Sequence, residues 1–207
     1  MEFNVQQLER SNLYQLLVGC ILPRPIAWVS TQDLKGACNL APFSFFNVMS
    51  INPPLLGISI LKQASERDKD TLANIRLTGE LVVNIVSQQL AEAMNASCGA
   101  YPADVDEFEL AGVAKVQSTT VKPPGVGEAP VRLECTLHQC LTFGHGTGAG
   151  NLVLAEVRHI HVAERVWRDG AIDDVALQAV GKLGGDRYSL GQPAFSLSRP
   201  EPGLQRG

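Results

Sequence analysis

Two long strand-like runs, residues 131–143 and 152–162, are separated only by a glycine-rich segment, and this arrangement most limits the folds open to the chain. We interpret the segment as a flexible hairpin tip between neighbouring strands. Further apolar runs of strand length occur at residues 26–31, 54–61 and 81–86. With about six strands, few helical patterns and no alternation of strand with helix, the sequence predicts a mainly β protein. The expected fold is a closed, antiparallel, six-stranded barrel with peripheral helices.

Only a few segments show helical character. The mixed apolar spacing of residues 5–18 predicts a short helix or turn. A second helix is expected to begin at Asp70 and to reach Ile75, and a third to cover residues 88–96. Residues 99–112 follow neither a helical nor a strand period, so we expect a long loop there.

Length and charge limit the class of protein. At 207 residues with 45% hydrophobic residues, the chain can form one sizeable core. We expect a single domain over residues 1–207, with its core at about 12–190 and a tail at 191–207. The net charge of −4, spread without long runs, argues against a nucleic-acid partner.

The cysteines and the N-terminus suggest a compartment. The five cysteines are odd in number and form no CxxC pair, which fits reduced thiols in a cytoplasmic protein. The N-terminus lacks a basic region and the apolar run at 16–22 is short, so we expect neither a signal peptide nor a membrane span. Cys38 could be redox-active, but a partly buried, inert thiol is the preferred interpretation.

Residues 23–54 concentrate small polar groups between apolar runs, which is typical of a binding site more than of a core. Residues 26–31 form a strand, and residues 33–36 a hairpin-type turn. Residues 39–46 are expected to return irregularly, because Pro42 cannot donate to a regular strand ladder. This would leave backbone groups free to face a ligand.

Several short motifs along the chain occur in the order seen in one protein family. They are Arg24-Pro25 through Thr31, Asn39-x-Ala41-Pro42-x-Ser44-x-Phe46, Asn52-Pro53-Pro54, Lys69-Asp70-Thr71-x-x-Asn74, Glu134-Cys135 and Leu183-Gly184-Gly185-x-x-Tyr188. The chain therefore resembles the flavin reductase-like family of FMN-binding split-barrel proteins, which includes flavoredoxin. The resemblance implies a Greek-key split barrel that binds FMN, and a homodimer whose flavin site is completed by both chains.

A seat for the FMN phosphate is expected at the start of the second helix. By themselves, the cations and the hydroxyl there suggest either an anion site favoured by the helix dipole or a solvated charged turn with a helix cap. The resemblance favours the phosphate. The candidate residues are Arg67, Lys69, Asp70, Thr71 and Asn74.

The isoalloxazine ring needs hydrogen-bond donors and a flat apolar wall. The resemblance implies that backbone amides of the first strand and of the return segment make many of these contacts. The candidate residues are Trp28, Val29, Ser30, Thr31, Asn39, Leu40, Ala41, Ser44 and Phe45. The alternative for Trp28 and Phe45 is simple barrel core, whereas several polar groups so close together need partners when buried.

Other chemistries find little support in the sequence. The run Gly144-x-Gly146-x-x-Ala149 matches a dinucleotide fingerprint formally, but a strand follows it where the fingerprint requires a helix. The four histidines and the cysteines show no recognised metal-ligand spacing, so we expect no metal. No hydrolase motif occurs either.

The sequence thus predicts an FMN-binding oxidoreductase in which NAD(P)H passes a hydride to flavin and no side chain is an obligatory catalytic acid or base. One departure from the sequence pattern of related reductases affects the prediction that NAD(P)H is used. Related short-chain reductases often carry a Gly-Asp-His-Thr pattern where this chain has Gly148-Ala149-Gly150-Asn151. An electron carrier like flavoredoxin, reduced by a partner protein, is therefore the alternative, and a non-catalytic flavin-binding module is a third possibility.

Overall fold

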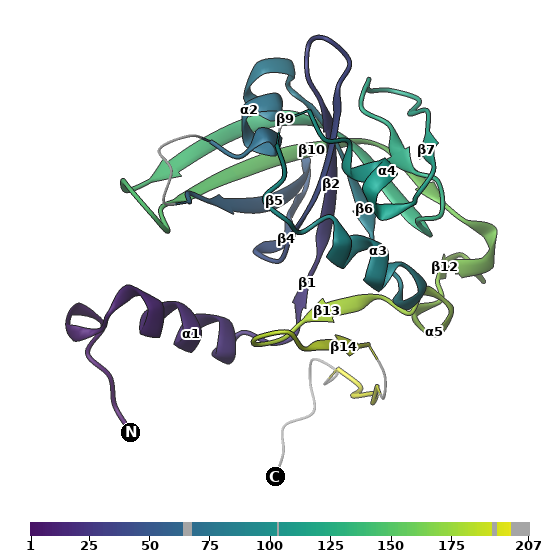
Figure 1. Cartoon of the computed structure of the whole chain (residues 1–207). Helices are drawn as coiled ribbons and strands as arrows, with labels where there is room; N and C mark the ends of the chain where they lie inside the picture. The colour runs from purple at the N-terminus through teal and green to yellow at the C-terminus, as the bar shows by residue number, and fades with distance from the viewer. Residues whose placement is uncertain (64–67, 103, 192–193, 200–207) are drawn as a thin grey trace.

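The computed structural model describes residues 1–63, 68–102, 104–191 and 194–199. Its centre is one antiparallel sheet (Figure 1). In chain order the strands of this sheet are β2 (Ala27–Gln32), β3 (Cys38–Phe43), β4 (Phe46–Ile51), β5 (Pro54–Leu61), β6 (Glu80–Ile85), β9 (Val131–Phe143) and β10 (Gly150–Val162). In space the order is β3-β2-β6-β9-β10-β5-β4.

The order of the strands explains why the sheet closes into a barrel. The two edge strands, β3 and β4, are consecutive in the chain and only Ser44 and Phe45 separate them, so the sheet must curl until its edges approach each other. Beside this link, the Ser59 amide of β5 donates to the Phe45 carbonyl at 2.8 Å. Strands β5 and β6 are also consecutive but lie apart, with β9 and β10 between them. Such a long connection is typical of Greek-key topology.

The remaining elements lie around this barrel. A second small sheet joins β1 (Arg24–Pro25), β13 (Val180–Lys182) and β14 (Tyr188–Leu190). The other elements are η1 (Val5–Gln7), α1 (Arg10–Cys20), α2 (Asp70–Thr78), η2 (Gln88–Leu90), α3 (Ala91–Ala96), α4 (Glu107–Ala111), β7 (Lys115–Val116), β8 (Gly125–Val126), η3 (Glu164–Val166), β11 (Trp167–Arg168), β12 (Ala171–Ile172) and α5 (Asp174–Leu177). None of the helices in the described part of the chain has the length and apolar character needed to cross a membrane.

The prediction of a mainly β, antiparallel barrel is confirmed, but the sheet has seven strands where about six were expected. Strands β3 and β4 are the two that were not among the expected strand runs, and the expectation of an irregular return is wrong at β3. Strand β3 pairs with β2 without interruption from Gln32 opposite Cys38 to Ala27 opposite Phe43. Pro42 is tolerated because β3 lies at the edge of the sheet, where alternate amides point away from the partner strand.

One hydrogen bond shows which backbone amides of β3 point away from β2. The Leu40 amide points away from β2 and donates to the Glu107 carboxylate at 3.1 Å. Pro42 lies two residues further along, so its missing N–H falls at another outward position. By the same alternation, the Ala41 amide faces β2 and belongs to the ladder opposite Val29.

The predicted helices are confirmed at 88–96 and at Asp70, where α2 runs on to Thr78 and ends at Gly79 with φ of 71°. The prediction of a long loop at 99–112 is wrong in its second half, which forms α4. The Asp106 side chain caps this short helix by accepting from the Phe108 amide at 3.0 Å. Only 1% of Phe108 is exposed, and a five-residue helix anchored by one aromatic side chain shows no sequence period.

The two faces of β2 pack into two different hydrophobic clusters. Val29 points into the barrel with Ile58, Ile75 and Val153, where α2 closes one end of the core. The opposite face of β2 packs below α3 and α4. The buried residues of that second cluster are Ile26, Trp28, Leu40, Val86, Leu90, Met94, Phe108, Val126, Ala129 and Val180.

Candidate functional site

A cavity of about 270 Å³ lies against the outer side of β3, which forms one wall through Asn39, Ala41 and Pro42. The first turn of α2 forms a second wall, and the segment that follows α3 forms a third. The cavity therefore lies where three segments that are distant in the sequence meet. Its lining brings together five of the predicted site residues: Asn39, Ala41, Lys69, Asp70 and Thr71.

Lys69 is the cation among the residues that line this cavity. Burial lowers the pKa of the Lys69 ammonium group, and within the described residues this group makes no hydrogen bond or ion pair. Its nitrogen lies 5.4 Å from the centre of the Phe43 ring. Lys69 is also the N-cap residue of α2 and its side chain makes no cap hydrogen bond, so its ammonium group lies beside the positive end of the dipole of a nine-residue helix. A partly buried cation at a helix N-terminus is suited to an anion.

Two hydrogen bonds fasten α2 to the strands and use four predicted residues. The Asn39 amide donates to the Thr71 hydroxyl at 2.8 Å. The Asn74 amide donates to the Thr31 hydroxyl at 3.1 Å. Because the Thr71 oxygen accepts from Asn39, its own proton remains for an acceptor in the cavity. The two bonds thus hold the helix N-terminus and the strand wall in one fixed arrangement.

The other predicted ring-binding residues have different places. The Trp28, Val29 and Leu40 side chains are fully buried in the two cores. The Trp28 indole donates to the Ser97 hydroxyl at 2.9 Å, which ties β2 to the segment after α3. The Ser30 hydroxyl donates to the Pro124 carbonyl at 2.6 Å. These side chains support the cavity wall from behind and do not line it.

Ser44 and Phe45 form the link between β3 and β4. The Phe45 ring stacks on Tyr14 of α1 with centroids 6.5 Å apart. Ser44 accepts a long hydrogen bond of 3.5 Å from the Arg24 guanidinium. The predicted phosphate residue Arg67 lies outside the described residues.

Sequence reasoning missed Glu107, a largely buried carboxylate that lines the cavity. Burial raises the pKa of Glu107, while the hydrogen bond from the Leu40 amide opposes this rise and the nearby Asp106 and Asp70 add to it. Glu107 also occupies the outward amide of β3, which was expected to face a ligand. Only the local acidity of residues 104–109 could have drawn attention to it.

A second, smaller cavity of about 90 Å³ adjoins the first, and Pro42 and Cys98 line both. Its remaining lining is Ile26, Phe43, Ser44, Met94, Lys182 and Tyr188. The first cavity is therefore polar, with Lys69 among the acidic residues Asp68, Asp70 and Glu107, and the second is mainly apolar with one cation. Together they offer a phosphate-like group and a flat ring the two environments that each requires.

The class of protein that the fold defines is a mainly β, antiparallel barrel with two adjoining cavities at the β3 edge. Residues 18–175 match the family described as flavin reductase like domain, and the chain belongs to this family.

Three relatives illustrate the similarity. An uncharacterized protein of Halalkalibacterium halodurans, BH2278, is 40% identical, and the match covers 97% of each chain. The structure of nitrilotriacetate monooxygenase component B from Bacillus cereus is 34% identical with a TM-score of 0.91, and covers 95% of this chain and 98% of its own. A protein of Shewanella frigidimarina NCIMB 400 with a split barrel domain is 25% identical with a TM-score of 0.82, over 97% and 100% of the two chains. The family and the split-barrel fold that the motifs suggested are thus confirmed.

Proposed function

We propose that this protein binds FMN across the two cavities and acts as an oxidoreductase that passes a hydride between NAD(P)H and the flavin. The observation that carries the proposal is the Lys69 ammonium group, which is partly buried beside the N-terminus of α2 without an anionic partner in the described residues. A phosphate monoester would supply the missing charge. Membership of the flavin reductase-like family supports FMN as the molecule that carries it.

Different residues of the site would bind different parts of FMN. Lys69, Thr71 and the α2 amides would hold the phosphate, and the ring would extend along the outer side of β3 toward the apolar cavity. FMN, once bound, supplies the two-electron chemistry. The protein positions the ring and excludes water with Pro42 and Phe43. No side chain is required as an acid or base for hydride transfer itself.

A second candidate function, an electron carrier reduced by a partner protein, is favoured by Gly150. This residue stands where related short-chain reductases have a histidine, and it opens β10 opposite Leu61 and Phe143. A side chain there would meet the Ser59 hydroxyl at 3.0 Å. The chain therefore has no imidazole at this position to contact a nicotinamide.

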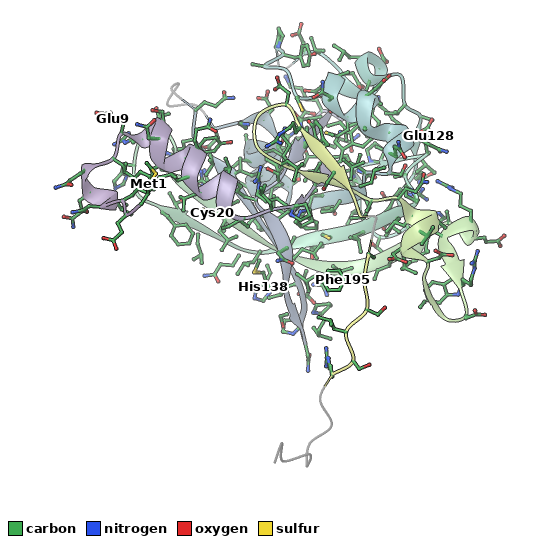
Figure 2. The ribbon with its side chains drawn as sticks, turned by 90° about the horizontal axis from the view of Figure 1, so that it is seen from below. Met1, Glu9, Cys20, Glu128, His138 and Phe195 are labelled. Carbon is green, nitrogen blue, oxygen red and sulfur yellow. The ribbon has the colours of Figure 1, made fainter. Side chains whose placement is uncertain are left out.

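A homodimer is the assembly we propose, and α1 is the main support for it. The helix extends away from the barrel (Figure 1), and Val18 is its one buried residue. Tyr14, Leu17 and Ile21 are 47%, 52% and 62% exposed. Figure 2 shows α1, between Glu9 and Cys20, on the side of the molecule opposite Glu128. An apolar helix so poorly covered by its own chain needs another surface, and a second copy can supply one.

One absorbance experiment separates the functions. Protein mixed with FMN, and freed of excess by gel filtration, should remain yellow. Bleaching by NADH or NADPH in the absence of oxygen identifies a reductase. Bleaching by dithionite alone identifies a carrier, and protein that retains no FMN contradicts both.

A further inference from the structure

Lys182 is a cation held in an apolar cavity, and neither the phosphate site nor hydride transfer accounts for it. It is the last residue of β13 and lies opposite both Arg24 of β1 and Tyr188 of β14. Its ammonium nitrogen lies 4.2 Å from the centre of the Tyr188 ring. The same nitrogen donates to the Gly185 carbonyl and, at 3.4 Å, to the Arg187 carbonyl. The charge is therefore fixed within its own hairpin.

The hairpin is in turn fixed to the rest of the molecule. Arg24 is only 6% exposed, and its guanidinium donates to the Leu183 carbonyl of the hairpin at 3.0 Å and to the Ile21 carbonyl after α1 at 3.0 Å. On the other strand, the Tyr188 hydroxyl donates to the Asn95 side chain of α3 at 3.2 Å. Lys182 is thus held in place at the wall of the second cavity. The apolar side chains of Ile26 and Met94 line the same cavity.

The two lysines line different members of the pair of joined cavities. Lys69 lines the first cavity and Lys182 the second, and Cys98 lines both. Burial raises the pKa of the Cys98 thiol, and both Lys182 and Lys69 oppose that rise. The fields of both cations therefore reach the junction between the cavities. A ligand that occupies both cavities therefore meets one lysine in each.

We propose that Lys182 faces the N1–C2 carbonyl edge of the flavin and raises the midpoint potential of bound FMN. This inference rests on the proposed FMN function. A hydride from a nicotinamide, or two electrons from dithionite together with one proton from water, forms the N5–H bond and leaves a negative charge shared by N1 and the C2 carbonyl oxygen. A fixed ammonium group at that edge stabilises the reduced ring more than the neutral oxidised ring.

The test compares Lys182→Gln and Lys182→Arg with a matched control, Lys35→Gln. Lys35 is exposed at the β2–β3 turn, so its loss changes the net charge equally but far from the cavities. Midpoint potentials of bound FMN are measured by equilibration with a reference dye. Lys182→Gln should lower the ratio of reduced to oxidised flavin about tenfold at a given potential, which is about 30 mV for a two-electron couple. Lys182→Arg and Lys35→Gln should both remain close to wild type.

Sulfite provides a second readout that involves no enzymatic turnover. Its addition to N5 forms an N–S bond and moves the electron pair to N1, so the adduct carries the same negative charge as the reduced ring. Lys182→Gln should weaken adduct formation about tenfold, and Lys182→Arg should restore it. An unchanged potential together with a raised KM for NAD(P)H would assign Lys182 to the nicotinamide cofactor and overturn the proposal.

Wild-type protein tests the same point if Lys182→Gln fails to fold. By linkage, a raised potential requires that reduced FMN bind more tightly than oxidised FMN. Equal or weaker binding of reduced FMN overturns the inference while FMN binding itself stands. Failure to bind either form contradicts the proposed function instead.

Discussion

The two edges of the barrel sheet differ in how they are covered. At the β3 edge, the Leu40 amide is occupied by Glu107, the Pro42 position has no N–H, and α4 packs alongside. At the β4 edge, Val48 and Ile51 are 57% and 82% exposed. One edge is thus closed by the chain's own groups and forms a cavity wall, whereas the other presents apolar side chains to solvent.

The difference shows how an antiparallel sheet can use its edges for different purposes. An exposed edge strand tends to pair with other chains, and β-bulges or covering segments prevent this. β4 has a register shift between Val48 and Ser50, which interrupts its edge, so we expect contact there through side chains and not through an added strand. A groove beside this edge, lined by Leu55, Val157 and Ile160 among others, extends the apolar surface. We assign the β3 edge to the flavin and the β4 edge, with α1, to the second subunit.

The largest expected effect is on folding. Ala41→Pro deletes an amide that faces β2 and leaves the Val29 position without its ladder partner, which should lower the free energy of unfolding by up to about 3 kcal/mol. Met49→Pro, at the register shift of β4, should cost much less, because Met49 has no partner in the ladder. Urea unfolding measures both. Equal losses would show that the two edges do not differ in this respect.

The next effect concerns assembly. Ile51→Asp places a charge in the apolar surface of β4 and should weaken a dimer at least about hundredfold, because an unpaired carboxylate is costly to bury. Leu34→Asp is the matched control, since Leu34 is 73% exposed at the β2–β3 turn. Light scattering over a range of concentrations should show monomers for Ile51→Asp alone. A wild-type protein that is monomeric with FMN bound would sink the dimer proposal.

A smaller effect is expected at the phosphate. Lys69→Met removes a charge-assisted contact while it retains an aliphatic stem beside Phe43, so the Kd for FMN should rise about tenfold or more. Riboflavin, which lacks the phosphate, should bind both proteins equally. Lys122→Met provides a control of equal charge outside the two cavities. An FMN affinity unaffected by Lys69→Met would place the phosphate elsewhere.

The smallest effect concerns pH. The pKa of Glu107 is raised in the folded protein because the carboxyl group is buried, so the folded state binds more protons than the unfolded state between the two pKa values. Stability from this group is present at low pH and declines as the pH rises through the folded pKa. Glu107→Gln keeps an acceptor for Leu40 but does not titrate. Its stability relative to wild type should therefore increase with pH above about 4.5, and a difference independent of pH would refute this assignment.

Sequence patterns predicted which elements form the site better than they predicted the direction in which the side chains point. The start of α2 at Asp70 is correct, and the predicted Lys69, Asp70 and Thr71 all line the cavity. They could be found because helix-start signals and cations are local. Trp28 was an ambiguous case, and its side chain proved to belong to the outer core. Strand β2 is buried on both faces, so no polar alternation distinguishes the side of Trp28 from that of Val29.

Two further residues of the cavities, Glu107 and Lys182, depended on contacts that no local pattern reveals. Glu107 reaches Leu40 across 67 residues of sequence. Lys182 enters the second cavity only because the C-terminal hairpin pairs with β1. In the sequence, Glu107 lies in a segment with neither a helical nor a strand period, and Lys182 precedes Leu183 without a distinguishing pattern. Both therefore look like ordinary surface residues. Their roles follow from segments that meet in space.

By itself, the sequence determined the mainly β class, the antiparallel pairing of the longest strands, the helix that begins at Asp70 and the family. Each depends on a property of neighbouring residues, such as apolar period, turn composition or the order of short motifs. Tertiary structure alone decided that Pro42 lies in a regular edge strand, that Trp28 supports the wall from behind, and that Lys69 and Lys182 line two adjoining cavities. The reason is that the face of a doubly buried strand, and the partner of an edge, are fixed by the packing of distant segments.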